Sequence, residues 1–101
     1  MGTMTIIKVD GSIEVTKDLR VCPGIQTLQK GVGGLIETVP YFNKYEGEPC
    51  VAYCNEEGKI VGLDYNKVAS ELWYEQVPMA RDMLVGDVVI LQGDAAFMRS
   101  I

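Results

Sequence analysis

A run of closely spaced glycines divides a helical pattern from a β-rich segment in the first half of the chain. Apolar residues recur every three or four positions between Ile25 and Val32, which predicts a short amphipathic helix. Gly31 or Gly33 can take the left-handed conformation that ends a helix, and Leu35–Val39 then forms a strand. Glycine loops that bind phosphate follow a strand and open a helix, so the reversed order here argues against a phosphate site.

An Asp-Gly dipeptide predicts a β-hairpin at the start of the chain. It lies between the β-rich runs Met4–Val9 and Ser12–Thr16, and this dipeptide is a strong signal for a tight turn. We therefore expect these two runs to pair as antiparallel strands.

A second hairpin is predicted around residues 55–58, where Gly58 suits the position of a turn that requires positive φ. The turn separates Cys50–Cys54 from Lys59–Leu63. Both runs are therefore expected to be strands that pair with each other.

The last third of the chain predicts one more helix and one more strand. Asn66 offers a side-chain cap for a helix that carries an apolar stripe and ends before Pro78. Val88–Leu91 is apolar at every position, which indicates an interior strand covered on both faces. The order β-β-α-β-β-β-α-β predicts one α+β domain over residues 1–101, with a mixed or mostly antiparallel sheet of about six strands and two helices packed on one face.

Composition and charge exclude several classes of function. The net charge is −5, and the nine Lys and Arg residues are scattered along the chain, which argues against a nucleic-acid surface. No apolar stretch reaches membrane-spanning length, and no basic segment precedes an apolar run at the N-terminus. Three cysteines do not suit a secreted disulfide framework, so we expect a cytoplasmic protein with reduced thiols.

The cysteines predict packing rather than chemistry. On one strand, Cys50 and Cys54 would lie roughly 13 Å apart, too far for a disulfide, and would point to the same face. We expect them to be small buried hydrophobic residues. The chain contains no histidine, so neither a metal site nor a nucleophile paired with histidine is expected, and no cofactor is predicted.

Glu37 interrupts the apolar pattern of its predicted strand. Alternation places its side chain on the same face as Leu35 and Val39. A sheltered carboxylate requires a partner, for which Lys59, Arg81 or a donor group of a ligand is a candidate. The alternative is an edge strand on which Glu37 simply reaches water, and the sequence leaves both open.

The C-terminal third is unusually apolar for so small a chain, which predicts self-association. We expect a homodimer that covers these residues. They are Met79, Met83, Phe97, Met98 and Ile101.

Several short motifs in a fixed order resemble a domain family of unknown function that is found widely in phages, prophages and plasmids. The resemblance covers Leu28–Leu91, and the chain departs from the pattern at Asp64-Tyr65, where such proteins often carry a proline. The motifs are Leu28-Gln29, Val32-Gly33-Gly34, Ile36-Glu37, Asn55-Glu56-Glu57-Gly58-Lys59, Gly62-Leu63, Asn66, Ala69 and Val85-Gly86-Asp87.

The resemblance implies an accessory protein of a mobile element and provides no catalytic residues. The leading hypothesis is a non-enzymatic module that binds a host protein or a small nucleotide-like molecule, for example to interfere with host defence. A small enzyme that depends on a carboxylate, and a nucleic-acid accessory factor, are the alternatives. The candidate ligand-binding residues are Gln29, Glu37, Asn55, Lys59 and Asn66.

Overall fold

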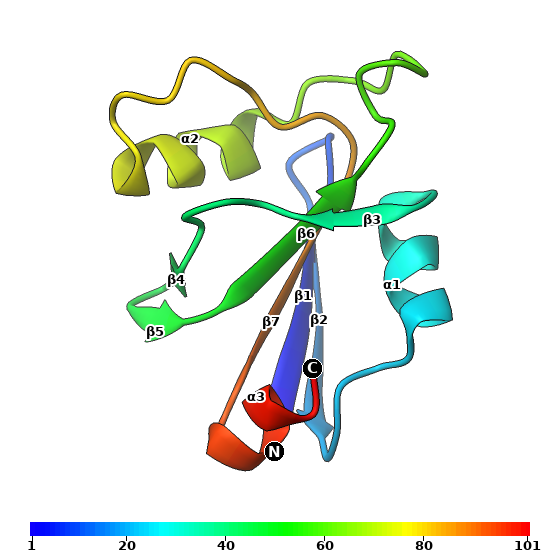
Figure 1. The fold of residues 1–101 in the computed structure, drawn as a ribbon, viewed down its shortest axis with the longest axis vertical. Coiled ribbons are helices and arrows are strands. Elements are labelled where there is room, and N and C mark those ends of the chain that lie inside the picture. Colours follow the sequence, from blue (N-terminus) through cyan, green and yellow to red (C-terminus); the bar gives the residue numbers. More distant parts are fainter.

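The computed structural model describes all 101 residues as an α+β fold built on a five-stranded antiparallel sheet with the strand order β2-β1-β7-β6-β3 (Figure 1). A separate two-stranded sheet pairs β4 with β5. The elements are β1 (Gly2–Ile7), β2 (Ile13–Leu19), α1 (Ile25–Val32), β3 (Ile36–Thr38), β4 (Lys44–Tyr45), β5 (Glu48–Pro49), β6 (Val51–Asn55), α2 (Lys67–Gln76), β7 (Val88–Gly93) and α3 (Ala95–Arg99).

The predicted N-terminal hairpin is confirmed. β1 and β2 pair antiparallel, with Ile7 opposite Ile13 at the closed end. In the connecting turn, the Asp10 carboxylate accepts hydrogen bonds from the backbone and the hydroxyl of Ser12, and Gly11 has a φ of 89°. A glycine is needed there because other residues rarely adopt that conformation.

β7 is the central strand, as its uniformly apolar sequence predicted. It pairs with β1 on one side and with β6 on the other, and both pairings are antiparallel. The four side chains from Val88 to Leu91 have no exposed surface. Both faces of this strand are therefore covered by other parts of the protein.

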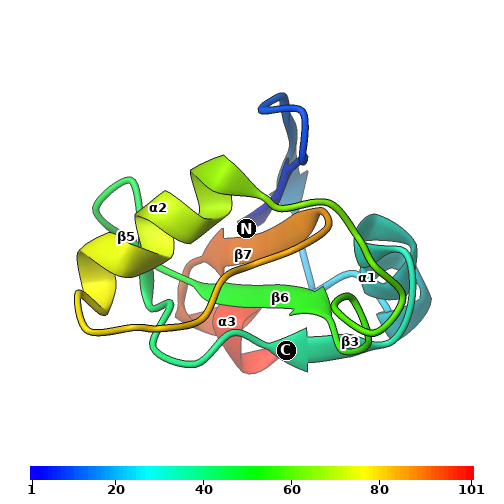
Figure 2. The same cartoon turned by 90° about the horizontal axis from the view of Figure 1, so that it is seen from above.

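The two main helices lie on opposite faces of the sheet, so the prediction that they share one face was wrong. α2 packs against Val88 and Ile90, whereas α1 packs against Val89 and Leu91. Alternate residues of a strand point to opposite faces, which is why one apolar strand can serve two helices. Figure 2 shows α2 in front of the sheet, α3 behind it and α1 to the right of the strands.

The predicted strand Lys59–Leu63 is wrong, because these residues form a series of turns. Their backbone bonds are local, with the Val61 N–H donating to Glu57 and the Leu63 N–H donating to Gly58. The physical reason is that β6 already has β3 on one edge and β7 on the other. No edge of β6 remains to which a following strand could pair.

The C-terminal helix α3 was not predicted, and it buries one of the apolar residues that were expected to lie in a dimer interface. The Asp94 carboxylate caps the helix by accepting from the Phe97 N–H, and the Phe97 ring is fully buried beside Gly2 and Gly93. A Cβ on Gly2 would lie 2.4 Å from that ring. Phe97 is therefore a core residue and is unavailable to a second copy of the chain.

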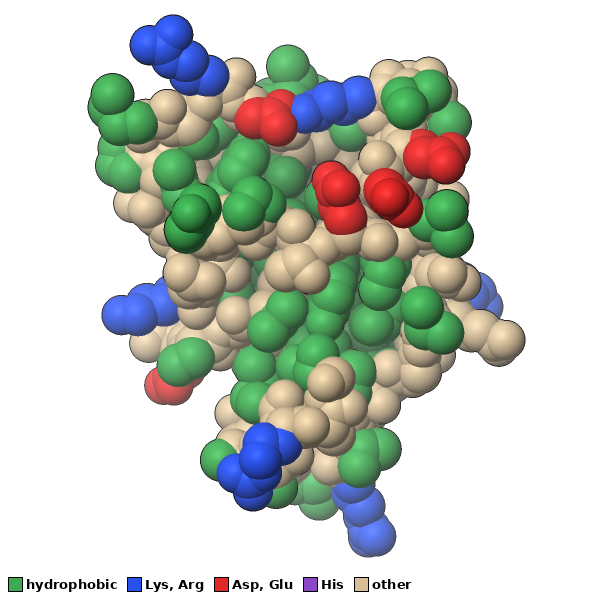
Figure 3. All heavy atoms as spheres, in the orientation of Figure 1, with side chains coloured by type: hydrophobic (Ala, Val, Ile, Leu, Met, Phe, Trp, Pro, Cys, Tyr) green, Lys and Arg blue, Asp and Glu red, His purple; other side chains and the backbone are tan.

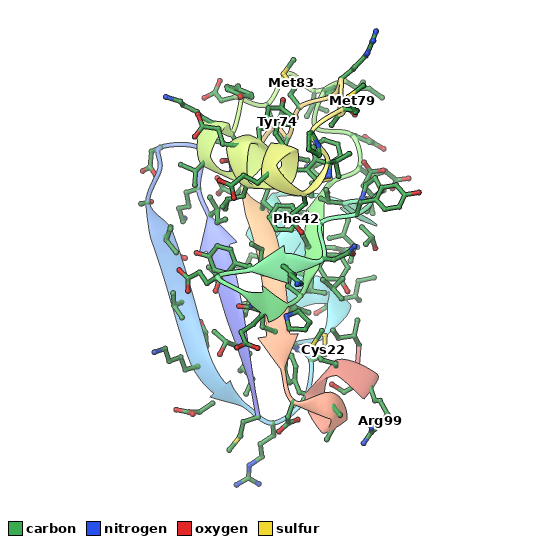
Figure 4. The ribbon with its side chains drawn as sticks, turned by 90° about the vertical axis from the view of Figure 1, so that its left-hand side faces the viewer. Cys22, Phe42, Tyr74, Met79, Met83 and Arg99 are labelled. Atoms are coloured by element: carbon green, nitrogen blue, oxygen red, sulfur yellow. The ribbon has the colours of Figure 1, made fainter.

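The other C-terminal apolar residues do not form one patch. Met79 and Met83 lie at the end of the molecule that carries α2, whereas Arg99 of α3 lies at the opposite end (Figure 4). Met98 packs partly into the core behind the sheet, and Ile101 follows α3. None of the three helices has the length and hydropathy needed to cross a bilayer.

Candidate functional site

A cavity of about 400 Å³ opens beside strand β3, between the turn that follows β6 and the segment that precedes β7. We call it the Glu37 cavity. Fourteen residues line it, and half of them are hydrophobic. They are Glu37, Thr38, Val39, Pro40, Cys54, Asn55, Glu56, Lys59, Ile60, Trp73, Asp82, Met83, Leu84 and Val85.

Glu37 lies on the edge strand β3, directly opposite Cys54 of β6. Its neighbour Ile36 packs on the α1 face, so the Glu37 side chain belongs to the α2 face. The residue is exposed, and the only group that donates a hydrogen bond to its carboxylate is the Cys54 thiol, with Sγ 3.7 Å from Oε1. Of the two alternatives that the sequence leaves open, the structure therefore has the edge strand on which Glu37 reaches water, and not the sheltered carboxylate.

Lys59 pairs with Asp82 rather than with Glu37. Their side chains form an ion pair that joins the turn after β6 to the segment before β7, and both remain more than half exposed. This ammonium and the Met83 backbone N–H hold the pKa of Asp82 below its usual value. Neither of the candidate partners, Lys59 and Arg81, forms an ion pair with the Glu37 carboxylate.

The thiols of Cys54, which lines the cavity, and of Cys50, which lies outside it, are poor nucleophiles. Burial, together with the adjacent Glu37 carboxylate, raises the pKa of the Cys54 thiol to about 12. Burial raises the pKa of Cys50 to about 11. Only the thiolate is reactive, so both groups are inert at neutral pH. The prediction that these residues are buried and unbridged, on one face of the sheet, is confirmed.

Asn55 lines the cavity, but its side-chain amide is hydrogen-bonded to backbone groups of the protein. Its Nδ2 donates to the Val32 carbonyl oxygen at 3.3 Å, and its Oδ1 accepts from the Glu57 N–H at 2.8 Å. These bonds join the end of α1 to the turn that follows β6. The amide packs so closely against Gly34 that a Cβ there would lie 2.7 Å from Nδ2.

Asn66 and Gln29 lie outside the cavity. Asn66 is fully buried at the start of α2, where it caps the helix by accepting from the Ala69 N–H and donates to the carbonyls of Ile7 and Gly86. Gln29 lies on α1, behind the sheet, and its backbone oxygen accepts from the glycines that end the helix. The structure thus brings together only Glu37, Asn55 and Lys59 of the five predicted residues.

The cavity is also lined by Glu56, Trp73 and Asp82, which are not among the five predicted ligand-binding residues. Trp73 reaches the cavity from α2, and its indole N–H donates to the Pro40 carbonyl at 2.8 Å. Asp82 belongs to a segment without regular structure that is attached to α2 through Ser70, whose hydroxyl bonds both the N–H and the carbonyl of Leu84. No local pattern signals such an attachment, because it depends on contacts between distant residues.

A sequence family described as a domain of unknown function, DUF3846, matches residues 4–99. The chain belongs to this family. The DUF3846 match takes in both the N-terminal hairpin and every residue that lines the Glu37 cavity. It confirms the resemblance to a domain family of unknown function and extends it beyond Leu28–Leu91 in both directions. No curated protein and no solved structure matches the chain.

Proposed function

We propose that this protein is a non-enzymatic binding module that holds a small molecule, or a side chain of a protein partner, in the Glu37 cavity. The observation that carries the proposal is a carboxylate at the mouth of a mixed cavity that no cation of the protein neutralises. The partner is a host protein or a small molecule in the cytoplasm of a host cell, as expected for a phage or plasmid accessory protein.

The size and composition of the cavity support binding. Pockets for small molecules typically measure about 300 to 1,000 Å³ and combine apolar walls with a few polar groups that fix orientation. At about 400 Å³ and with half of its wall residues hydrophobic, the Glu37 cavity has room for a small organic group. It lies at one edge of the sheet, where both a free ligand and a projecting side chain of a partner have access.

The chemistry of the walls favours binding over catalysis. Nucleophilic catalysis needs an activated group, and burial keeps the thiol of Cys54, the cysteine of the wall, protonated at neutral pH. Asp82 is neutralised by Lys59, and its pKa is lowered, which makes it a weaker general base. Glu37 and Glu56 remain as the unpaired carboxylates of the wall on which the alternative of a carboxylate-dependent enzyme could rely.

An NMR fragment screen tests the proposal. The ¹⁵N-labelled protein is titrated with a library of small cationic, neutral and anionic compounds that includes nucleoside monophosphates. We expect saturable shifts of backbone amides in β3, in the 55–60 turn and in the segment 82–85. Glu37→Gln should weaken the hits, whereas Glu48→Gln, which removes the same charge at an exposed site outside the cavity, should not.

Two outcomes would contradict the proposal. If no member of the library shifts the cavity amides saturably, the cavity is not a binding site. If a bound fragment is chemically converted by substoichiometric protein, and Glu37→Gln abolishes that conversion, the enzyme alternative is correct instead.

A further inference from the structure

We infer that the Glu37 cavity recognises an ammonium or guanidinium group carried on a short apolar stem. The inference rests on the proposed function and specifies the ligand of the same site. Two sources share this chemistry, namely a lysine or arginine side chain of a protein partner and a free organic amine. The hydrogen-bonding groups of the cavity wall that the fold leaves unused decide which ligand fits.

Three of the uncharged side-chain donors of the wall already donate to protein acceptors, and the Thr38 hydroxyl is the one that makes no hydrogen bond. The Trp73 indole N–H donates to Pro40, the Asn55 amide donates to Val32, and the Cys54 thiol donates to Glu37. A ligand rich in acceptors would therefore find few free donors at this site. The wall offers it mostly ring carbons, aliphatic groups and carboxylate oxygens.

The acceptors of the wall, in contrast, are largely free. Glu37 receives only the thiol contact, and the Glu56 side chain takes part in no hydrogen bond or ion pair. Lys59 is balanced by Asp82, so the two glutamates leave the cavity with negative charge that no wall cation neutralises. Figure 3 shows acidic side chains gathered over β3 and the turn that follows β6.

Charge and hydrogen bonding thus point to the same ligand. A phosphate or carboxylate would be repelled by the glutamates and would lack donors, whereas a cation supplies both the missing charge and the missing N–H groups. A guanidinium can also bond both oxygens of one carboxylate at once. The nucleotide-like alternative is the less favoured one for this cavity, because its phosphates carry the wrong charge.

The remaining wall residues explain the apolar stem. Val39 and Leu84 are buried at the base of the cavity, and Ile60 and Met83 are exposed at its rim. An alkyl chain laid between them would remove the two exposed side chains from water. Lysine and arginine carry such a chain, and buried stems with charged ends are common for both residues.

The test uses four probes with the same butyl stem: n-butylammonium, n-butylguanidinium, n-butanol and n-butyl phosphate. Each is titrated against the ¹⁵N-labelled protein at low salt while the amides of Thr38, Cys54 and Glu56 are followed. We expect saturable binding of the two cations only. Glu37→Gln and Glu56→Gln should each weaken the cations about tenfold, and Glu48→Gln should leave their affinity unchanged.

A peptide, acetyl-Gly-Lys-Gly-amide, separates the two sources. If it binds at least as tightly as n-butylammonium, the site accepts a protein side chain, and if only the free amine binds, the ligand is a small amine. Equal or tighter binding of the alcohol or the phosphate at the same amides would overturn the inference and leave the binding module intact. Saturable binding by none of the probes, together with an empty fragment screen, would overturn both.

Discussion

Replacing Asn66 by alanine should lower the free energy of unfolding by about 4 kcal/mol, because this one side chain joins three separate elements. Its Oδ1 caps α2 through the Ala69 N–H. Its Nδ2 donates to the Ile7 carbonyl at the end of β1, at 2.9 Å, and to the Gly86 carbonyl ahead of β7, at 3.0 Å. The residue has no exposed surface, so water cannot replace these bonds in the native state.

The magnitude follows from the three bonds. Loss of an N-cap costs about 1 kcal/mol. Each buried carbonyl that loses its donor costs about 1.5 kcal/mol, which brings the total to about 4 kcal/mol. A domain of this size is typically stable by about 5 to 15 kcal/mol, so the Asn66→Ala protein should fold but be markedly less stable.

Urea denaturation followed by circular dichroism measures the effect, which we expect as a fall in midpoint of roughly 2 M at an unchanged slope. Asn43→Ala is the control, because Asn43 is exposed and its side chain makes no hydrogen bond. Asn66→Asp keeps the cap but sets a carboxylate against the two carbonyls. The loss of unfolding free energy in this variant should therefore become smaller as the pH falls and the acid is protonated. A loss below about 1 kcal/mol for Asn66→Ala would refute the reasoning.

Three further predictions concern the core and the assembly. The thiols of Cys50 and Cys54 ionise at higher pH in the folded state than the ordinary value of 9.0, so their contribution to stability should be constant below pH 9 and fall between pH 9 and the folded pKa values of about 11 and 12. The loss should be about 1 kcal/mol per thiol at pH 10, and replacing both cysteines by alanine should reduce this alkaline slope in urea titrations. Cys22, Tyr45 and Tyr53, whose pKa values burial also raises, should keep the remainder of the slope. Gly93→Ala should destabilise the protein by about 3 kcal/mol, since its Cβ would lie 2.8 Å from the backbone of Gly2, and an unchanged melting temperature would contradict this. The expected homodimer should give twice the mass of the chain by light scattering at high micromolar concentration, and a monomeric mass would exclude it.

The local signals of the sequence were sufficient for much of the fold. Asp10-Gly11 indicated the first hairpin, the apolar run Val88–Leu91 indicated the central strand, and glycine indicated the end of α1, where Gly33 has a φ of 78°. Each of these features depends on the conformational preferences of a few neighbouring residues. They are therefore readable from a single segment.

The errors arose where distant segments compete. Lys59–Leu63 has the composition of a strand, but β3 and β7 occupy both edges of β6, and no property of residues 59–63 reveals that competition. The same limit applies to the placement of the helices. α1 and α2 both carry an apolar stripe, and only the register of β7 decides that the stripes meet opposite faces of the sheet.

The polar residues of the candidate site fall into two groups, those bonded to the backbone and those left free. The amides of Asn55 and Asn66 looked like ligand groups, yet in each the oxygen accepts from a nearby backbone N–H and the nitrogen donates to backbone carbonyls far away in the sequence. A carboxylate on an edge strand is different, because the sheet needs none of its oxygens and the fold would form without them. Glu37 and Glu56 keep their capacity to accept hydrogen bonds beside a cavity whose wall is half hydrophobic, and unused capacity is what a ligand requires. Binding at this site should therefore depend on the two glutamates far more than stability does, which is the reverse of what we expect for Asn66.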